Sequence, residues 1–267
     1  IAIMRRAASI SADAHRRAMR ATRPGRHAYE LEAELLHGFR RRGCQATAYS
    51  SIVAGGANAC ILHYIGNDRI LRDGDLLLID AGGELDGYAS DITRSFPVNG
   101  RFSGAQADVY RLVLDAQIAA IAAIKPGVSF LDPHEAALKV LVQGMLDLRL
   151  LQGSLDGIIE SEAYKRFYLP RTSHWLGRDV HDAGAYKHGE TWQILQPGML
   201  LTVEPGCYIR AADDVPVAFH NIGVRIEDDA LVIADGCEII THEAPKSIRD
   251  IEALMQSEMG IKWVESA

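Results

Sequence analysis

Four acidic residues interrupt apolar, strand-like segments of this chain: Asp80, Asp91, Glu204 and Glu227. Asp80 ends the apolar run 76–79, and Glu204 follows the run 200–203. Carboxylates in such places are expected to be partly buried, and a buried charge needs a partner. The neighbouring cations are too few to pair with all four acids, although a salt bridge accounts for any one of them alone; they are Arg94, Arg210 and Arg225. A metal cluster accounts for the four acids together.

The acidic pattern occurs twice along the chain. Ile79-Asp80-Ala81-Gly82 resembles Val203-Glu204-Pro205-Gly206, and Gly87 precedes Asp91 by four residues as Gly223 precedes Glu227. Hydrophobic periodicity predicts helices over 3–22, 28–42, 104–124, 131–149 and 248–259, and strands over 70–79, 87–98, 200–209 and 223–233. We therefore expect one α+β domain over residues 1–267, with two related halves of about 1–100 and 101–267.

Composition limits the class of protein. The chain holds 28 Lys+Arg and 35 Asp+Glu, and this net charge of −7 argues against a general nucleic-acid binder. Apolar residues make up 48%, too many for a disordered chain, and no apolar stretch approaches the roughly 18 residues of a membrane span. Four scattered cysteines are typical of reduced thiols, so we expect a cytoplasmic protein. From the charge and the short apolar stretches we expect neither nucleic-acid nor membrane partners. Because the chain opens with Ile1, we also expect an upstream domain to be missing.

Histidines supply the remaining candidate ligands. His174 and His181 lie seven residues apart beside Trp175-Leu176-Gly177, and His63 lies in an apolar stretch. A lone histidine is more often structural, so His63 alone would be a core residue, whereas the pair favours a cleft with a metal ligand. Four carboxylates balance two divalent ions, and ions about 3.5–4 Å apart are usual in two-metal hydrolases. Oxygen ligands with one imidazole suit Mn²⁺, and also Co²⁺, Zn²⁺ or Fe²⁺.

Seven motifs carry a family resemblance. They are Ile61-Leu62-His63-Tyr64, Leu78-Ile79-Asp80-Ala81-Gly82, Ser90-Asp91-Ile92-Thr93-Arg94-Ser95-Phe96, Ser173-His174-Trp175-Leu176-Gly177, Val180-His181-Asp182, Thr202-Val203-Glu204-Pro205-Gly206 and Arg225-Ile226-Glu227-Asp228. In order and spacing, from about residue 1 to about 255, the chain resembles the metallopeptidases of the aminopeptidase P and prolidase group, peptidase family M24. This resemblance implies the pita-bread (creatinase/aminopeptidase-like) fold, a curved antiparallel sheet flanked by helices.

The resemblance also implies two divalent metal ions, usually manganese, and it implies which residues of this chain would be their ligands. Asp80 would bind one ion, while Asp91 and Glu227 would bridge both. His174 and Glu204 would hold the second ion. Larger members of the group carry a non-catalytic N-terminal domain, which agrees with the expected upstream domain.

The implied activity is hydrolysis of the peptide bond between an N-terminal residue and a following proline. Glu204 would carry the proton of the attacking water to the proline nitrogen. His181 would help to stabilise the oxyanion, and His63 would contact the proline. Tyr208 and Arg225 match positions that support the ligands and the substrate. The expected partner is a peptide with proline second, and we expect a homo-oligomer.

Other functions stay open at this point. A prolidase acting only on Xaa-Pro dipeptides would have the same metal site, whereas a non-catalytic binding module would be expected to lose ligands. Methionine aminopeptidases share the ligand pattern but not the contexts of His63 and His174. Two positions depart from the group, since Pro170 stands where histidine is usual and Arg178 where an apolar residue is usual. Neither is a ligand, so we predict metal-dependent hydrolysis with an altered cleft.

Overall fold

The computed structural model describes residues 1–168 and 171–257. The helices among these residues are α1 (Ala2–Ala21), α2 (Ala28–Arg41), α3 (Gly104–Ala123), α4 (Asp132–Asp147), α5 (Leu155–Glu160) and α6 (Ile248–Gln256). Five of them confirm predicted helices, and the short α5 was not predicted. Residues 258 and 259, at the end of the last predicted helix, lie outside the described residues.

The strands pair only in antiparallel fashion within the described residues. They are β1 (Ala46–Thr47), β2 (Ile52–Gly55), β3 (Leu76–Asp80), β4 (Gly83–Glu84), β5 (Thr93–Pro97), β6 (Lys187–His188), β7 (Thr191–Trp192), β8 (Leu200–Val203), β9 (Gly206–Ile209), β10 (Ile222–Arg225), β11 (Asp228–Ile233) and β12 (Gly236–Ile239). The main sheets have the orders β2-β3-β5, β12-β11-β8 and β10-β9. This mixture of helices and antiparallel strands confirms the predicted α+β class.

Each of the four long predicted strands is shorter or broken, and the breaks fall at the acids. Segment 200–209 divides into β8 and β9 at Glu204-Pro205, because proline has no N–H to donate to a ladder. Segment 223–233 divides at Ile226-Glu227, and the earlier two are strands only over β3 and β5. Gly74, with φ of +84°, makes the turn that precedes β3. Asp80, Glu204 and Glu227 therefore lie at or directly beside strand ends, and Asp91 lies two residues before β5, so their side chains can leave the sheet.

Strands β5 and β10 bring the two halves together. The Glu227 amide donates to the Thr93 carbonyl oxygen at 3.0 Å, and the Arg225 amide donates to the Ser95 hydroxyl at 3.1 Å. Ser95 in turn donates to the Arg225 carbonyl oxygen at 3.0 Å. These bonds place the segment that follows Asp91 beside the segment that precedes Glu227, although the two acids are far apart in sequence.

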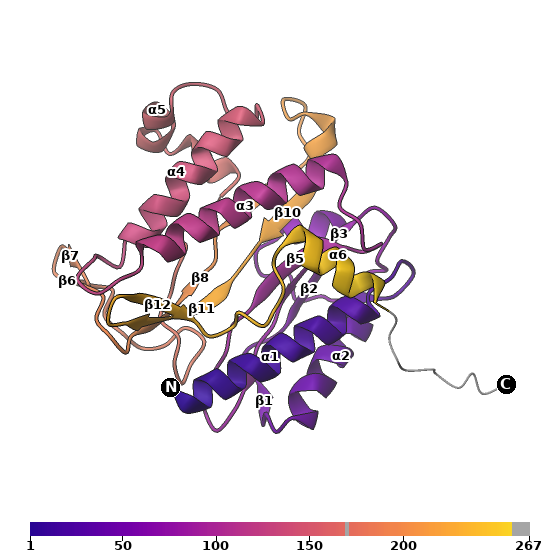
Figure 1. Cartoon of the computed structure of the whole chain (residues 1–267). Coiled ribbons are helices and arrows are strands. Elements are labelled where there is room, and N and C mark those ends of the chain that lie inside the picture. Colours follow the sequence, from indigo (N-terminus) through magenta and orange to yellow (C-terminus); the bar gives the residue numbers. More distant parts are fainter. Residues whose placement is uncertain (169–170, 258–267) are drawn as a thin grey trace.

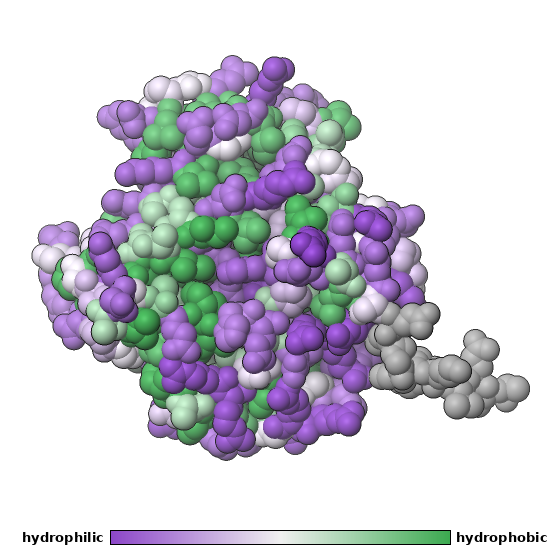
Figure 2. Space-filling model, in the orientation of Figure 1, coloured by the Kyte–Doolittle hydropathy of each residue, from purple (hydrophilic) through white to green (hydrophobic). Residues whose placement is uncertain are grey.

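The helices cover the strands in pairs, α1 with α2 and α3 with α4 (Figure 1). Ser103 caps α3 in a capping box with Gln106, and Ser247 caps α6 by accepting from the Asp250 amide. In the same orientation, Figure 2 shows a mixed surface with hydrophobic side chains gathered around α3 and α4. Within the described residues, no helix is both long and apolar enough to cross a membrane.

Candidate metal centre

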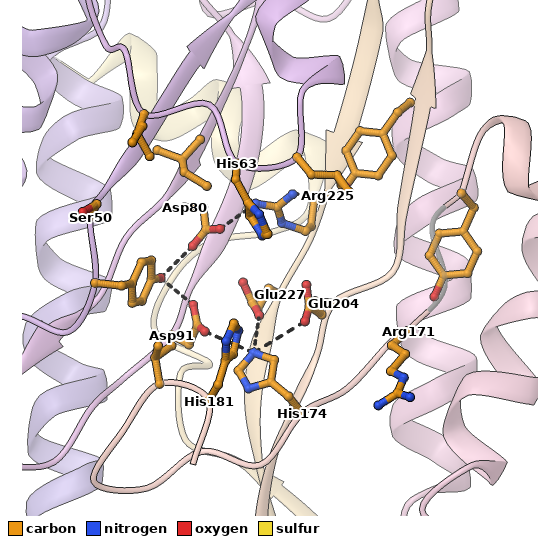
Figure 3. Close-up of a pocket in the computed structure, with 17 residues that line it drawn as sticks. Ser50, His63, Asp80, Asp91, Arg171, His174, His181, Glu204, Arg225 and Glu227 are labelled. Carbon is orange, nitrogen blue, oxygen red and sulfur yellow. Dashed lines mark hydrogen bonds and ion pairs between the residues drawn. The ribbon is translucent and has the colours of Figure 1, made fainter. Parts of the chain in front are cut away.

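The predicted ligands converge on one point of the fold. The Nε2 atom of His174 lies 3.4 Å from an Asp91 oxygen, 3.5 Å from a Glu204 oxygen and 3.9 Å from a Glu227 oxygen (Figure 3). One ligand atom each from Asp91, His174 and Glu227 can be chosen so that all three lie within 4.8 Å of one another. Asp91, His174 and Glu227 thus form the tightest part of the group.

Asp80 joins this group through a tyrosine that the sequence did not reveal. The Tyr49 hydroxyl lies 2.6 Å from an Asp80 oxygen and also contacts an Asp91 oxygen. The other Asp80 oxygen accepts from Arg225 at 2.5 Å. Tyr49 is an isolated aromatic residue between short segments, so no periodicity or spacing marked it. It ties together the two aspartates of the first half.

The competing reading, in which arginines neutralise the acids, holds only for Asp80. Among the described residues, Asp91, Glu204 and Glu227 have no lysine or arginine nitrogen within 4 Å. Arg94 pairs with Asp228 instead, and Arg210 donates to the Cys60 carbonyl oxygen. Three buried or half-buried carboxylates around one imidazole therefore remain without a compensating arginine, which is the arrangement a divalent cation would satisfy.

The electrostatics of the cluster agree with this view. Burial raises the pKa of Glu204 to about 7 and the pKa of Glu227 well above its ordinary value, and neighbouring carboxylates add to both shifts. Burial works to lower the pKa of His174, but the bond to Asp91 and the charge of Glu204 raise it to about 9. The metal-free cluster thus holds protons, which a bound cation would displace.

Hydrogen bonds outside the cluster orient the ligands. His174 donates from Nδ1 to the Trp175 carbonyl oxygen at 3.0 Å, which leaves Nε2 facing the carboxylates. The Thr93 hydroxyl donates to Glu227 at 2.6 Å and accepts from Arg225 at 3.1 Å. Arg225 also donates to the Tyr208 hydroxyl at 2.9 Å. Tyr208 and Arg225 accordingly lie next to the ligands, as the resemblance implied.

Helix α1 supports the loops that carry the two aspartates. His15 and Ser11, both buried, face inward from this helix. His15 Nε2 bonds the Ala81 carbonyl oxygen at 2.9 Å, and Ser11 accepts from the Gly83 amide at 2.9 Å. Ser11 also shares a 2.7 Å bond with Ser90, the residue before Asp91. Neither residue was predicted from the sequence, because the only signal of each was its polarity on an otherwise apolar helix face.

The cluster opens into a cavity of about 520 Å³. His63 and His181 both line it, together with Tyr208, Tyr168 and Arg171. The rings of His174 and His181 meet edge to face with centroids 4.5 Å apart. His63 is therefore a cleft residue, and its apolar sequence neighbours did not make it a core histidine.

Of the two departures, Pro170 lies outside the described residues. Arg178 is exposed and is not among the described residues that line this cavity. Its effect on the cleft is therefore at most indirect, and an altered cleft shape cannot be attributed to direct contact with Arg178.

Comparison with known proteins identifies the family. Residues 2–234 match metallopeptidase family M24. The chain belongs to this family. It is 50% identical over 255 residues to the Xaa-Pro aminopeptidase of Haemophilus influenzae. The matched region covers 96% of this chain and 59% of that protein. It is 37% identical over 287 residues to human Xaa-Pro dipeptidase, covering 95% of this chain and 58% of that protein.

The solved structures confirm the predicted pita-bread fold. The aminopeptidase PepP of Pseudomonas aeruginosa superposes with a TM-score of 0.94 at 54% identity, covering 95% of this chain and 58% of that chain. The M24 chain described here therefore resembles aminopeptidase P, as its motifs indicated, and spans a little under three fifths of these relatives. Family membership and the converging ligands together assign it a divalent-metal site.

Proposed function

We propose that this M24 chain is the catalytic part of an Xaa-Pro aminopeptidase, which hydrolyses the bond between an N-terminal residue and a following proline. The observation that carries the proposal is the convergence of four carboxylates and one imidazole at the floor of a cavity that also presents His63 and His181. Two divalent ions, with manganese the one we expect, would be held by the five residues Asp80, Asp91, His174, Glu204 and Glu227.

The division of ligands between the ions is the one that the family resemblance implies, and the positions of the side chains support it. Asp91 and Glu227 would contact both ions, as the resemblance implies; they come from distant parts of the chain, and each has an oxygen within 4 Å of His174 Nε2. Asp80 would hold one ion from the Tyr49 side, and Glu204 and His174 would hold the other. When bound, ions in such clusters lower the pKa of water toward neutrality.

The proton steps fall to side chains of this chain. Glu204 faces the cavity with its side chain 24% exposed, so it can take a proton from the attacking water and donate it to the proline nitrogen. His181 stands beside His174 and is suited to donate a hydrogen bond to the developing oxyanion. His63 lines the same cavity and is suited to contact the leaving proline.

Proline specificity is supported by the relatives, which are named for Xaa-Pro substrates. A proline nitrogen has no N–H, and its ring restricts the preceding residue, so it needs a cleft shaped for it. Identity is higher to the aminopeptidase than to the dipeptidase, 50% against 37%. This difference favours the aminopeptidase over the prolidase alternative.

The test compares Ala-Pro-Ala with Ala-Pro as substrates for the Mn²⁺-loaded protein. We expect cleavage of the tripeptide and a loss of roughly 10²–10⁴ in kcat for Glu204→Gln. Glu243→Gln is the matched control. Glu243 is exposed, and among the described residues its side chain is hydrogen-bonded only to Ser9. Near-normal activity of Glu204→Gln would refute the mechanism, and cleavage of Ala-Pro alone would establish the prolidase instead.

Metal content gives an independent check. Elemental analysis after dialysis should find close to two divalent ions per chain in the unmodified protein. A chain that retains no metal and cleaves neither peptide would instead be a non-catalytic binding module on this fold.

A further inference from the structure

A second cavity adjoins the metal-site cavity. Its volume is about 270 Å³. Its lining residues come from the start of α4 and the two residues before it, from the segment before His174 and from β7; they are Phe130, Leu131, His134, Arg171, Thr172, Ser173 and Trp192. Arg171 lines both cavities, so the two meet at this side chain. Figure 3 shows Arg171 beyond Glu204, on the side away from Asp91.

Arg171 differs from the other arginine of the cleft. Arg225 is buried and paired with Asp80 at 2.5 Å. Arg171 is exposed, and in the described part of the chain no carboxylate oxygen lies within 4 Å of its guanidinium. Its Cζ atom lies 5.7 Å from the centroid of the Tyr186 ring, an arrangement that steadies the side chain without neutralising it. Arg171 can therefore offer its positive charge to a ligand.

The interior of the second cavity is largely apolar and carries no acid among its described lining residues. The rings of Phe130 and Trp192 lie nearly parallel, 16° apart, with centroids separated by 6.4 Å. His134 bonds Thr172 through Nδ1, and burial and the charge of Arg171 lower its pKa, which disfavours its charged form. Ser173 Oγ is buried without a hydrogen-bond partner among the described residues. The cavity is thus suited to an apolar group with one polar atom.

We propose that Arg171 and this aromatic cavity form a subsite for the C-terminal residue of a tripeptide, with the carboxylate at Arg171 and an apolar side chain in the cavity. The inference rests on the function proposed above and adds the preferred substrate length and third residue. Of the two charged ends of a peptide, only the carboxylate is attracted by an unpaired arginine. An N-terminal ammonium would be repelled by it.

The proposed subsite also predicts which length of peptide substrate is preferred. Two extended residues span about 7 Å, so the proposal places the C-terminal carboxylate of a tripeptide at Arg171 when its first peptide bond lies at the carboxylate cluster. A dipeptide ends one residue earlier and would leave Arg171 unpaired. A longer peptide carries its carboxylate further on, so it gains nothing from the guanidinium.

The experiment measures kcat/KM for Ala-Pro-Phe with a free carboxylate and for the same peptide with a C-terminal amide. Arg171→Ala should reduce the value for the acid by roughly tenfold and change the value for the amide by less than twofold. Arg171→Lys should recover part of the loss, because it keeps the charge but not the fork of donors. Arg178→Ala is the matched control, since Arg178 is also an exposed arginine but is not among the described residues that line either cavity.

A second variant tests the cavity itself. Leu131→Trp should fill it and lower kcat/KM for Ala-Pro-Phe more than for Ala-Pro-Gly, whose third residue needs no cavity. Equal losses for acid and amide in Arg171→Ala, or for Phe and Gly in Leu131→Trp, would mean a structural role and overturn the subsite. If the unmodified protein cleaves none of these peptides, the proposed function itself fails.

Discussion

Removal of Arg94 should destabilise this protein far more than removal of any exposed arginine. Arg94 is completely buried, and so is its partner Asp228, at 2.7 Å. Its guanidinium also donates to the carbonyl oxygens of Thr93, Glu227, Ala244 and Pro245. One side chain therefore joins β5, the turn that carries the proposed ligand Glu227, and the segment that leads into α6.

The magnitude follows from what Arg94→Ala leaves behind. Burial alone would raise the pKa of Asp228, but Arg94 and Lys246 hold it below its ordinary value. Lys246 would remain in the variant, 2.7 Å from Asp228. Breaking a buried ion pair from one side costs about 3–5 kcal/mol. For a chain of this size that corresponds to a decrease in Tm of roughly 6–20 °C.

Differential scanning calorimetry or thermal circular dichroism can measure the change. The matched control is Arg101→Ala, because the Arg101 side chain is 68% exposed and its pair with Glu252 is 3.4 Å long. Such a pair contributes about 0–1 kcal/mol. Arg94→Lys should give an intermediate loss, since one ammonium cannot replace five hydrogen bonds. A decrease in Tm for Arg94→Ala no larger than that of the control would refute the reasoning.

Three further predictions concern the site and its supports. Tyr49→Phe removes the hydroxyl shared by Asp80 and Asp91, so kcat should fall by about tenfold with Tm nearly unchanged; unaltered kcat and metal content would contradict this role. In EDTA, Tm should decrease as pH rises from about 5 to about 9, because folding raises the pKa of Glu204 to about 7 and that of His174 to about 9. The folded state binds these protons more tightly than the unfolded state, so its added stability is lost as the protons leave. A Tm that rises between pH 7 and 9 would argue against these pKa shifts. Gly82→Ala should abolish metal binding or folding, because the added Cβ would lie 1.7 Å from the Ser90 carbonyl oxygen. In the control variant Gly104→Ala the added Cβ meets nothing within 4 Å, so soluble yield and Tm should be kept. Equal behaviour of the two variants would contradict the clash.

The sequence indicated the candidate ligands because their chemistry conflicts with their surroundings. Asp80 and Glu204 follow apolar runs, and this local conflict between charge and burial is visible without a fold. The repeated spacing of acids added a second signal. Helix α3 was predictable from its own segment, which is rich in Ala, Ile and Leu.

The same local patterns did not give the strand breaks. Segment 200–209 has the composition of one strand, yet Glu204 and Pro205 separate β8 from β9. The break is favoured because the glutamate must point into the cavity and the proline cannot donate to the ladder. A composition average over ten residues does not register which of them must leave the sheet.

The sequence by itself determined the candidate inventory of this site, namely four acids that outnumber the neighbouring arginines and one histidine, and the fold class that contains them. The tertiary structure alone decided which other residues contact these five. Tyr49, Thr93 and His15 support the ligands through contacts between residues distant in the chain, and His63 became a cleft residue through the position of its loop. Hydrogen bonds and burial depend on distances in space, and these are fixed only when the two halves of the chain pack together.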